Sequence, residues 1–422
     1  MKRIDEIAAA LAGYDPQALS VAQVQAFLHA LVQPLPRTQT ESVPLMDARE
    51  RILAEDLISP IDVPPHDNSA MDGYAFDGRQ LGDAPLRLKV VGTALAGRAW
   101  QGQVGPGECL KIMTGAILPS GLDTVVPQEL TEVDGDAVRI APGVLRAGDN
   151  RRLRGEDLAQ GRAALAAGTR IGPAAWGLIA SLGIARVPVM RRVRVAYFST
   201  GDEILSLGDA PREGAVYDSN RYTVAGLLSR LGCEVIDLGV VRDDPVALKA
   251  AFTQAAQQAD AILTSGGVSV GEADFTKAMM KELGDVAFWK IAMRPGRPMA
   301  VGRIGDAVLF GLPGNPVAVM VTFLAFVRPA LMRLMGAAPN EPPLLQARST
   351  EAMRKKPGRT EYQRGIVWRD AEGQLRVRTT GNQGSGVLSS MVQGNGLIVL
   401  HHDQGSVAVD DLVEVMMFDG VI

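Results

Sequence analysis

The chain has 422 residues, of which 47% are hydrophobic and 21% are charged, and its formal net charge is −4. A single hydrophobic core stops growing near roughly 250–300 residues, so this length predicts several domains. The weakly negative charge excludes a general electrostatic footprint for nucleic acid, and any anionic ligand has to be met by local basic residues. We expect no nucleic-acid partner.

Two cysteines, Cys109 and Cys233, stand far apart in the sequence. They exclude a disulfide framework and a cysteine zinc site, and they favour a reducing compartment. Residues 1–13 mix charges with apolar residues, and no run elsewhere approaches about 18 uncharged apolar residues. We therefore expect a soluble, cytoplasmic protein with no membrane partner.

The first half of the chain predicts a small β-rich unit flanked by helices. Residues 86–140 carry short apolar runs separated by turn signals, which is typical of strands. Apolar residues at helical spacing, together with proline and glycine at the ends, predict the flanking helices. We expect helices at 20–32, 47–56 and 173–182.

Three polar segments in this half are open to two interpretations. The loop that contains Asp67, with two prolines and several short polar side chains, fits a turn scaffold and a ligand site equally well. Thr114 offers a hydroxyl beside a glycine, and this pattern usually marks only the end of a strand. Residues 150–157 combine three arginines with Glu156 and Asp157, and a solvated ion-paired loop is the simpler explanation.

The strongest pattern runs from residue 193 to 335, where apolar strand-like runs alternate with amphipathic helical stretches. This alternation predicts a doubly wound, mostly parallel sheet with helices on both faces. Four such strands are each followed by a polar or glycine-rich loop, so these loops are expected at one edge, where open α/β sheets bind ligands. The loop residues are Glu203, Asp243, Ser265, Gly266, Gly267, Ser269, Asp274, Pro313, Asn315 and Pro316.

Two features suit this edge to an anion. The helices expected to begin near Asp274 and at Pro316 present backbone N–H groups that attract negative charge. Lys290, Arg294 and Arg297 form a basic run stiffened by prolines, and guanidinium groups suit phosphates and oxyanions. After a proline-rich linker, strands at 361–368, 375–380, 397–401 and 412–417 predict a small C-terminal β-barrel, in which residues 384–386 form a turn or an oxyanion contact.

Several common catalytic signatures are missing. No Gly-x-Gly-x-x-Gly follows a strand and no Gly-Lys-Ser/Thr occurs, so dinucleotide-binding and P-loop fingerprints are absent. The four histidines offer no convincing partner for a nucleophile. We expect electrostatic and metal-assisted chemistry instead.

Taken together, six ordered motifs resemble the MoeA family of molybdopterin molybdenumtransferases, to which the gephyrin E domain also belongs. The resemblance covers nearly the whole chain. The motifs are DNSAMDGYA at 67–75, MTGA at 113–116, RGED at 154–157, STGDE at 199–203, SGGVSVGEAD at 265–274 and GLPGNP at 311–316.

The resemblance implies insertion of molybdenum from molybdate into adenylylated molybdopterin, with release of AMP and assistance from Mg²⁺. It also implies an elongated homodimer with its site between subunits, and contact with other cofactor-biosynthesis proteins. By motif, the pterin, metal and phosphate side would hold Asp67, Thr114, Asp157, Glu203, Asp243 and Asp274, with Glu203, Asp243 and Asp274 as metal candidates. The oxyanion side would hold Lys290, Arg294, Arg297, Pro313, Pro316, Arg364 and Ser385.

The resemblance also implies four parts. These are an elongated connecting domain at 20–60 and 141–190, a β-rich lid domain at 61–140, an α/β molybdopterin-binding domain at 191–337 and a β-barrel domain at 343–422. Arginine stands at 294 and 297 where the family often has lysine, and Ala318 stands where it often has serine. Because arginine keeps the charge and changes the geometry, molybdate affinity is what these departures affect.

Two other functions compete with this reading. One is adenylylation of molybdopterin, the preceding step, but that activity resembles the α/β module alone. The other is a non-catalytic scaffold like the clustering role of gephyrin, which needs partner-binding segments that the sequence does not show. Release of AMP distinguishes the transferase from both.

Overall fold

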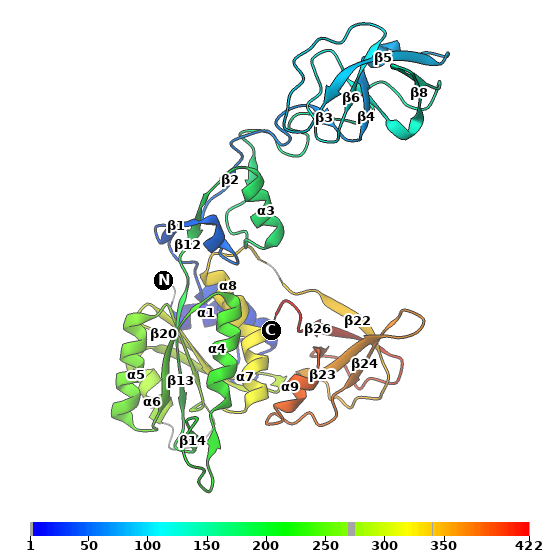
Figure 1. Ribbon diagram of the computed structural model, residues 1–422. Coiled ribbons are helices and arrows are strands. Elements are labelled where there is room, and N and C mark those ends of the chain that lie inside the picture. Colours follow the sequence, from blue (N-terminus) through cyan, green and yellow to red (C-terminus); the bar gives the residue numbers. More distant parts are fainter. Residues whose placement is uncertain (1–2, 269–274, 340, 422) are drawn as a thin grey trace.

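The computed structural model describes residues 3–268, 275–339 and 341–421. Figure 1 shows an elongated chain. A β-rich region, residues 61–140, which we name the lid, lies at one end. A narrow connecting part joins it to an α/β module, and a C-terminal barrel lies beside that module. Ser269 and Asp274, two predicted site residues, lie outside the described residues.

The α/β module is built on a six-stranded sheet in the order β16-β13-β17-β21-β20-β18. β16, β13, β17 and β21 are parallel, while β20 pairs antiparallel with β21 and β18. The prediction of a mostly parallel sheet is therefore confirmed. The strands are β13 (Arg194–Thr200), β16 (Glu234–Val241), β17 (Ala261–Ser265), β18 (Asp285–Lys290), β20 (Pro298–Ile304) and β21 (Ala307–Leu312).

Helices cover both faces of this sheet, because alternate strand residues point to opposite sides. Val195 and Tyr197 of β13 belong to one buried cluster, and Ala196 and Phe198 belong to another. The first cluster receives α1 (Ile4–Ala10), α2 (Val21–Leu31), α4 (Ser219–Leu231), α7 (Pro316–Thr322) and α8 (Arg328–Leu334). The second receives α5 (Pro245–Gln258) and α6 (Phe275–Leu283).

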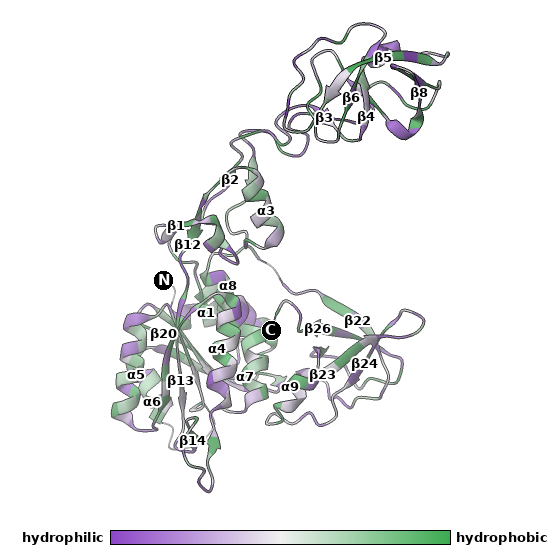
Figure 2. Cartoon of the chain, in the orientation of Figure 1, coloured by the Kyte–Doolittle hydropathy of each residue, from purple (hydrophilic) through white to green (hydrophobic). Residues whose placement is uncertain are grey.

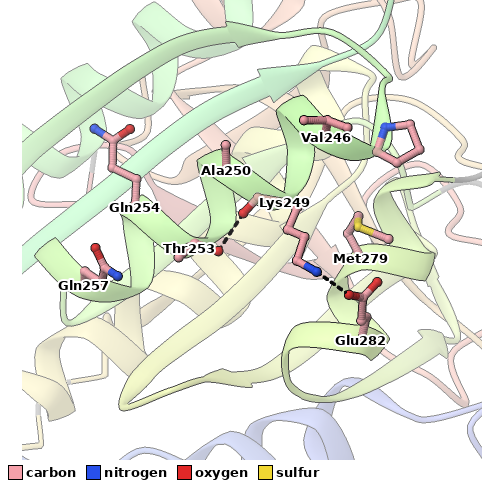
Figure 3. A pocket seen from close by; sticks show the side chains of 9 residues that line it. Val246, Lys249, Ala250, Thr253, Gln254, Gln257, Met279 and Glu282 are labelled. Atoms are coloured by element: carbon pink, nitrogen blue, oxygen red, sulfur yellow. Dashed lines mark hydrogen bonds and ion pairs between the residues drawn. The ribbon is translucent and has the colours of Figure 1, made fainter.

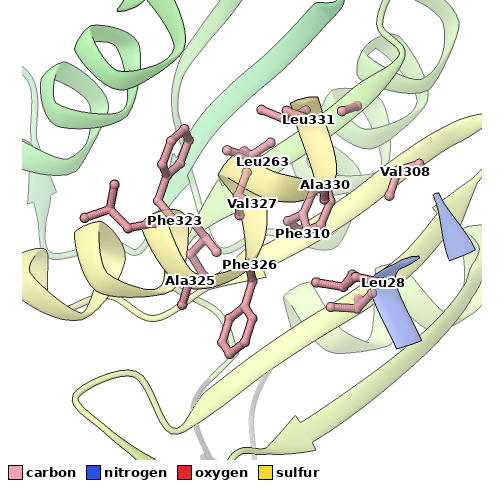
Figure 4. Close-up of a cluster of buried hydrophobic side chains, with 14 of the residues drawn as sticks. Leu28, Leu263, Val308, Phe310, Phe323, Ala325, Phe326, Val327, Ala330 and Leu331 are labelled. Carbon is pink, nitrogen blue, oxygen red and sulfur yellow. The ribbon is translucent and has the colours of Figure 1, made fainter. Parts of the chain in front are cut away.

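The longest apolar helical stretch of the described chain, Pro316–Leu334, runs through α7, the π-helical turn η4 (Phe323–Val327) and α8. Its mean hydropathy of 1.8 is high enough for a membrane span, but 83% of it is buried in the protein. Phe323 and Phe326 pack with Leu263, Phe310 and neighbouring side chains (Figure 4). Figure 2 shows α7 as predominantly hydrophobic, whereas α5 also carries hydrophilic residues. The stretch is a core helix of the module.

The connecting part contains α3 (Pro173–Ser181) and two small antiparallel sheets. The prediction of a helix at 47–56 is wrong. A 3₁₀ turn, η1 (Leu45–Ala48), ends before Glu50, whose φ of 63° is left-handed, and Ile52 and Leu53 then form β-bridges with Arg170 and Val189. The strand pairs are β1 (Thr40–Pro44) with β12 (Arg186–Met190), and β2 (Leu57–Ile58) with β11 (Ala163–Leu165).

The lid confirms the predicted β-rich unit and adds a strand pair that links it to residues 151–152. Its sheet has the order β7-β4-β6-β5-β9-β8. The strands are β3 (Asn68–Ser69), β4 (Gly73–Phe76), β5 (Leu86–Ala94), β6 (Glu108–Ile112), β7 (Thr124–Pro127), β8 (Thr131–Asp134) and β9 (Ala137–Ile140), with short turns η2 (Gly78–Gln80) and η3 (Gln128–Leu130) and with β10 (Arg151–Arg152) paired to β3.

The predicted C-terminal barrel is present and closed, because β23 pairs with both β24 and β25. β19 (Met293–Arg294), which carries part of the basic run, adds to β23 in parallel. Backbone pairing therefore joins the barrel to the α/β module. The barrel elements are β22 (Leu344–Ser349), β23 (Thr360–Arg369), β24 (Leu375–Thr379), α9 (Ser389–Gln393), β25 (Gly396–Leu400) and β26 (Leu412–Met417).

Candidate functional site

The structure brings together the loops at the carboxyl ends of β13, β16, β17 and β21. The N–H of Gly266 donates to the Leu312 carbonyl at 3.2 Å, so the loop after β17 touches the loop after β21. Asn220 at the start of α4 donates to the Gly314 carbonyl at 2.8 Å. The N–H of Asp243 lies 3.4 Å from a carboxylate oxygen of Asp202. The expected gathering of these loops at one edge is confirmed for the described residues.

Two glycines are required at this edge by backbone geometry. Gly266 has a φ of +90°, and a Cβ there would lie 2.4 Å from the Thr200 carbonyl oxygen. Gly267 has a φ of +64°, and its Cβ would lie 2.5 Å from the Thr276 side chain. A residue with a Cβ would be strained at these positive φ angles, and its Cβ would lie too close to the neighbouring atoms. The turn after β17 therefore depends on glycine.

The hydroxyl of the neighbouring Ser265 contacts other side chains inside the module. Its side chain is buried, and its oxygen lies 2.7 Å from the Tyr197 hydroxyl and 3.3 Å from the Ser199 hydroxyl. This hydroxyl is therefore turned into the module, whereas Asn315, the cap residue of α7, is exposed and makes no side-chain cap bond. Pro313, which follows the end of β21, is buried.

Carboxylates at the edge have the chemistry of a magnesium site. Mg²⁺ is usually held by one or two carboxylates together with substrate phosphates. Glu203 is exposed in the loop after β13, and Asp243 is half-buried in the loop after β16. No group of three acidic, histidine or cysteine side chains lies together in the described part of the chain. The described donors therefore fit a cation that shares its ligands with a substrate.

Lys290, Arg294 and Arg297, which we name the basic cluster, lie where the α/β module meets the barrel. Within the described residues, the three side chains make no hydrogen bond or ion pair, and both arginines are exposed. Two other arginines of the module, in contrast, are paired with carboxylates. Arg191 pairs with Asp260 at 2.7 Å and Arg221 with Asp237 at 2.8 Å. The basic cluster therefore keeps its positive charge available to an anion.

Arg364 supplies a further cation from β23 of the barrel. It is 1% exposed, and it donates to the Ser390 hydroxyl at 2.9 Å and to the Gly384 carbonyl at 3.0 Å. Burial, together with the nearby charge of Arg294, lowers the pKa of Arg364 to about 10. Within the described residues, this guanidinium has no carboxylate partner and lies near a second cation, the side chain of Arg294.

The loop held by Arg364 reaches the α/β module. The N–H of Val317, in the first turn of α7, donates to the Ser385 carbonyl at 3.1 Å. A cavity of about 300 Å³ opens beside this junction, lined by Arg294, Arg354, Arg364, Glu351, Glu361, Gln363, Gln383 and their neighbours. Of the predicted oxyanion residues, Arg294 and Arg364 therefore line one cavity, and Ser385 contacts the start of α7.

The predicted residues of the lid side lie elsewhere. Arg151 forms an ion pair with Asp67, and the Arg154 N–H donates to the same carboxylate at 2.7 Å. These contacts lower the pKa of Asp67, the Arg154 backbone hydrogen bond most of all. Thr114 donates through N–H and hydroxyl to Asp72, both at 2.7 Å.

Asp157 is exposed in the loop after β10, beside the lid. Figure 1 shows the lid at the opposite end of the chain from β14 (Ile204–Leu205) and β15 (Val216–Tyr217), which follow the carboxyl end of β13. One copy of the chain therefore does not bring Asp67, Thr114 or Asp157 to the edge that holds Glu203.

Sequence reasoning did not select two polar residues of the edge, Asp218 and Asn220. Asp218 is 4% exposed and caps α4 by accepting the Arg221 N–H at 3.0 Å. Asn220 reaches both Ser265 and Gly314. The signal available in the sequence was the Asp-Ser-Asn run at residues 218–220, at the start of a predicted helix.

A second, larger hollow of about 550 Å³ lies between α5 and α6 (Figure 3). Its charged lining residues, Lys249 and Glu282, are paired with each other at 2.7 Å. Val246 at its rim is 77% exposed. Because its two charged residues neutralise each other, this hollow is a weaker candidate for an anion than the junction of module and barrel.

Fold and site together define a multidomain α/β protein with a group of basic side chains where its central module meets the C-terminal barrel. Three family profiles match the chain. They are the MoeA N-terminal region (domain I and II) at residues 19–183, a probable molybdopterin binding domain at 196–333 and the MoeA C-terminal region (domain IV) at 346–418.

Curated relatives agree with the profiles. A molybdopterin molybdenumtransferase of Haemophilus influenzae is 43% identical over 386 residues, which cover 91% of this chain and 95% of the relative. One from a Nostoc species is 36% identical and covers 86% of this chain and 85% of its own length. A molybdopterin biosynthesis MoeA protein from Pyrococcus horikoshii OT3 has a TM-score of 0.81 at 27% identity, and the match covers 95% of this chain and all of that one.

The chain belongs to the MoeA family, and it is a transferase of molybdenum cofactor biosynthesis. The resemblance drawn from its motifs is confirmed.

Proposed function

We propose that this protein transfers molybdenum from molybdate to adenylylated molybdopterin and releases AMP. The observation that carries the proposal is the set of basic side chains at the junction of module and barrel that have no anionic partner among the described residues. Molybdate is a tetrahedral dianion, and guanidinium and ammonium groups bind such oxyanions through charge-assisted hydrogen bonds. Arg294, Arg364 and their neighbours supply these donors beside a cavity of about 300 Å³.

The pterin and its phosphates are assigned to the adjoining edge of the sheet. The glycine turn after β17 permits close approach of a ligand to the backbone. Glu203 and Asp243 would hold Mg²⁺, which supplies polarisation of the phosphoanhydride bond when it is bound. The chain's own contribution is to place the dinucleotide phosphates and the oxyanion side by side, and the basic cluster offsets the negative charge that they bring.

The proposal includes a homodimer in which the lid of one copy completes the site of the other. Its support is the separation of Asp67, Thr114 and Asp157 from Glu203 within one chain. It further includes a cytoplasmic location and contact with other proteins of cofactor biosynthesis. In favour of a reducing compartment, both cysteines are free and buried, and burial raises the pKa of each thiol to about 12.

Charge removal at the basic cluster tests the function. In an Arg294→Gln/Arg297→Gln variant, the molybdate concentration that gives half-maximal AMP release should rise about ten- to hundredfold, because two charge-assisted contacts are lost. The matched control is Arg369→Gln, which removes a charge at the far end of β23, where Arg369 donates to the Gly373 carbonyl at 2.9 Å. An equal molybdate requirement in wild type and double variant would refute the oxyanion assignment.

Subunit complementation tests the shared site. Asp67→Asn and Glu203→Gln variants should each lose AMP release, and a mixture refolded together should regain up to about a quarter of wild-type activity, since mixed dimers contain one intact site. If the mixture stays inactive although mixed dimers form, the lid does not serve the partner's edge. Transfer of adenylate to molybdopterin without molybdate would favour the preceding step, and retained dimerisation without turnover would favour a scaffold.

A further inference from the structure

Three hydroxyl groups meet beneath the edge of the sheet, and we name them the hydroxyl triangle. The Tyr197 hydroxyl lies 2.9 Å from the Ser199 hydroxyl and 2.7 Å from the Ser265 hydroxyl, and the two serine oxygens are 3.3 Å apart. All three side chains are at most 2% exposed. The triangle joins the ends of β13 and β17, the two central strands of the parallel part of the sheet.

Each hydroxyl carries one hydrogen, so the three groups satisfy one another when each donates to its neighbour around the ring. Burial raises the pKa of Tyr197, which keeps its hydroxyl protonated. Without this hydroxyl, the two serines retain a single long contact, and one buried donor loses its partner. Tyrosine at 197 therefore supplies a hydrogen-bonding hydroxyl that phenylalanine, which has nearly the same shape, lacks.

The triangle continues to the second loop of the edge. The Asn220 side-chain N–H₂ lies 3.4 Å from the Ser265 oxygen and donates to the Gly314 carbonyl at 2.8 Å. The Gly266 N–H, next along the chain, donates to the Leu312 carbonyl. One connected set of hydrogen bonds thus fixes the turn at 265–267 relative to the turn at 313–315.

We propose that Tyr197 is a positioning residue, which holds the turns at 265–267 and 313–315 at the spacing that binds the pterin phosphates. The inference rests on the proposed function of this edge. Tyr197 touches no ligand and acts through Ser265 and Asn220. Ser265 consequently serves as a structural link and does not contact substrate through its hydroxyl.

The test is Tyr197→Phe, examined in the full-length protein. With adenylylated molybdopterin as substrate, KM should rise about five- to tenfold while kcat stays within about twofold, because loosened turns weaken binding in the ground state and in the transition state equally. Backbone amides of 261–268 and 311–317 should exchange with deuterium faster without any ligand present. Ser199→Ala should produce the same changes, and the double variant should add little, because both residues act in one network.

Tyr74→Phe is the matched control, since Tyr74 is a buried tyrosine of the lid that makes no side-chain hydrogen bond within the described residues. It should leave exchange at 261–268 and 311–317 unchanged. Unchanged exchange in Tyr197→Phe, or a fall in kcat at constant KM, overturns the positioning role. If wild type does not turn over adenylylated molybdopterin, the proposed function fails instead, and the exchange measurement still decides whether the triangle fixes the turns.

Discussion

Replacing Gly266 by alanine tests whether the turn after β17 has the shape described above. The residue has a φ of +90°, and a Cβ would lie 2.4 Å from the Thr200 carbonyl oxygen, which belongs to the backbone of a central strand. A side chain in this left-handed region costs about 1–2 kcal/mol. The overpacked contact adds about 1–3 kcal/mol, because neither backbone can move without breaking sheet hydrogen bonds.

Gly208→Ala separates these two contributions. Gly208 has a φ of +96° and no atom within 4 Å of its Cβ position, so alanine there meets the conformational cost alone. In urea unfolding followed by fluorescence, Gly266→Ala should lose about 1–3 kcal/mol more than Gly208→Ala. It should also lose AMP release, whereas Gly208→Ala should keep it. Equal losses of stability, together with retained activity in Gly266→Ala, would refute the close contact between the turn and β13.

Two further predictions concern the core and the lid. Phe326→Ala, in the π-helical turn of the buried helix, should reduce the free energy of unfolding by about 3–5 kcal/mol, while Val246→Ala, at an exposed position, should change it by less than about 0.5 kcal/mol. For Asp67, hydrogen bonds lower the pKa, so its carboxylate stabilises the lid above its unfolded-state pKa near about 3.9, and this contribution disappears as the pH falls through the folded pKa. The difference in unfolding temperature between wild type and Asp67→Asn should be largest near pH 7 and shrink as the pH falls below the unfolded-state pKa of about 3.9; a difference that does not change with pH would argue against this role.

Local patterns predicted the α/β module well, because alternation of apolar strands and amphipathic helices is a short-range signal. β13, β17 and β21 were found from runs such as 261–263, and their following loops meet as parallel topology requires. Strand β20 was not predicted, because the prolines at 295 and 298 suggested an irregular segment. The helix expected at 47–56 failed because Ile52 and Leu53 find strand partners more than 100 residues away.

The candidate site was predictable in part. That Glu203, Asp243 and Gly266 share an edge follows from the order of strands and loops. The closeness of Arg364 to Arg294 depends on β19 adding to a barrel strand, which no periodicity encodes. Likewise, Ser265 was expected among the loop residues of the ligand-binding edge, and its hydrogen bond with Tyr197 is a contact that only the packed sheet reveals. The separation of Asp67 from Glu203 within one chain depends on the length of the connecting part.

The proposed function requires the carboxyl edge of the sheet and the basic cluster to bind adenylylated molybdopterin and molybdate together. The most direct measurement is incubation of the protein with both compounds and Mg²⁺, followed by quantification of AMP and of molybdenum bound to the released pterin. The account predicts equal amounts of AMP and molybdenum-loaded pterin, and little AMP when molybdate is omitted. AMP release at the same rate without molybdate, or molybdenum-loaded pterin formed without AMP, would contradict it.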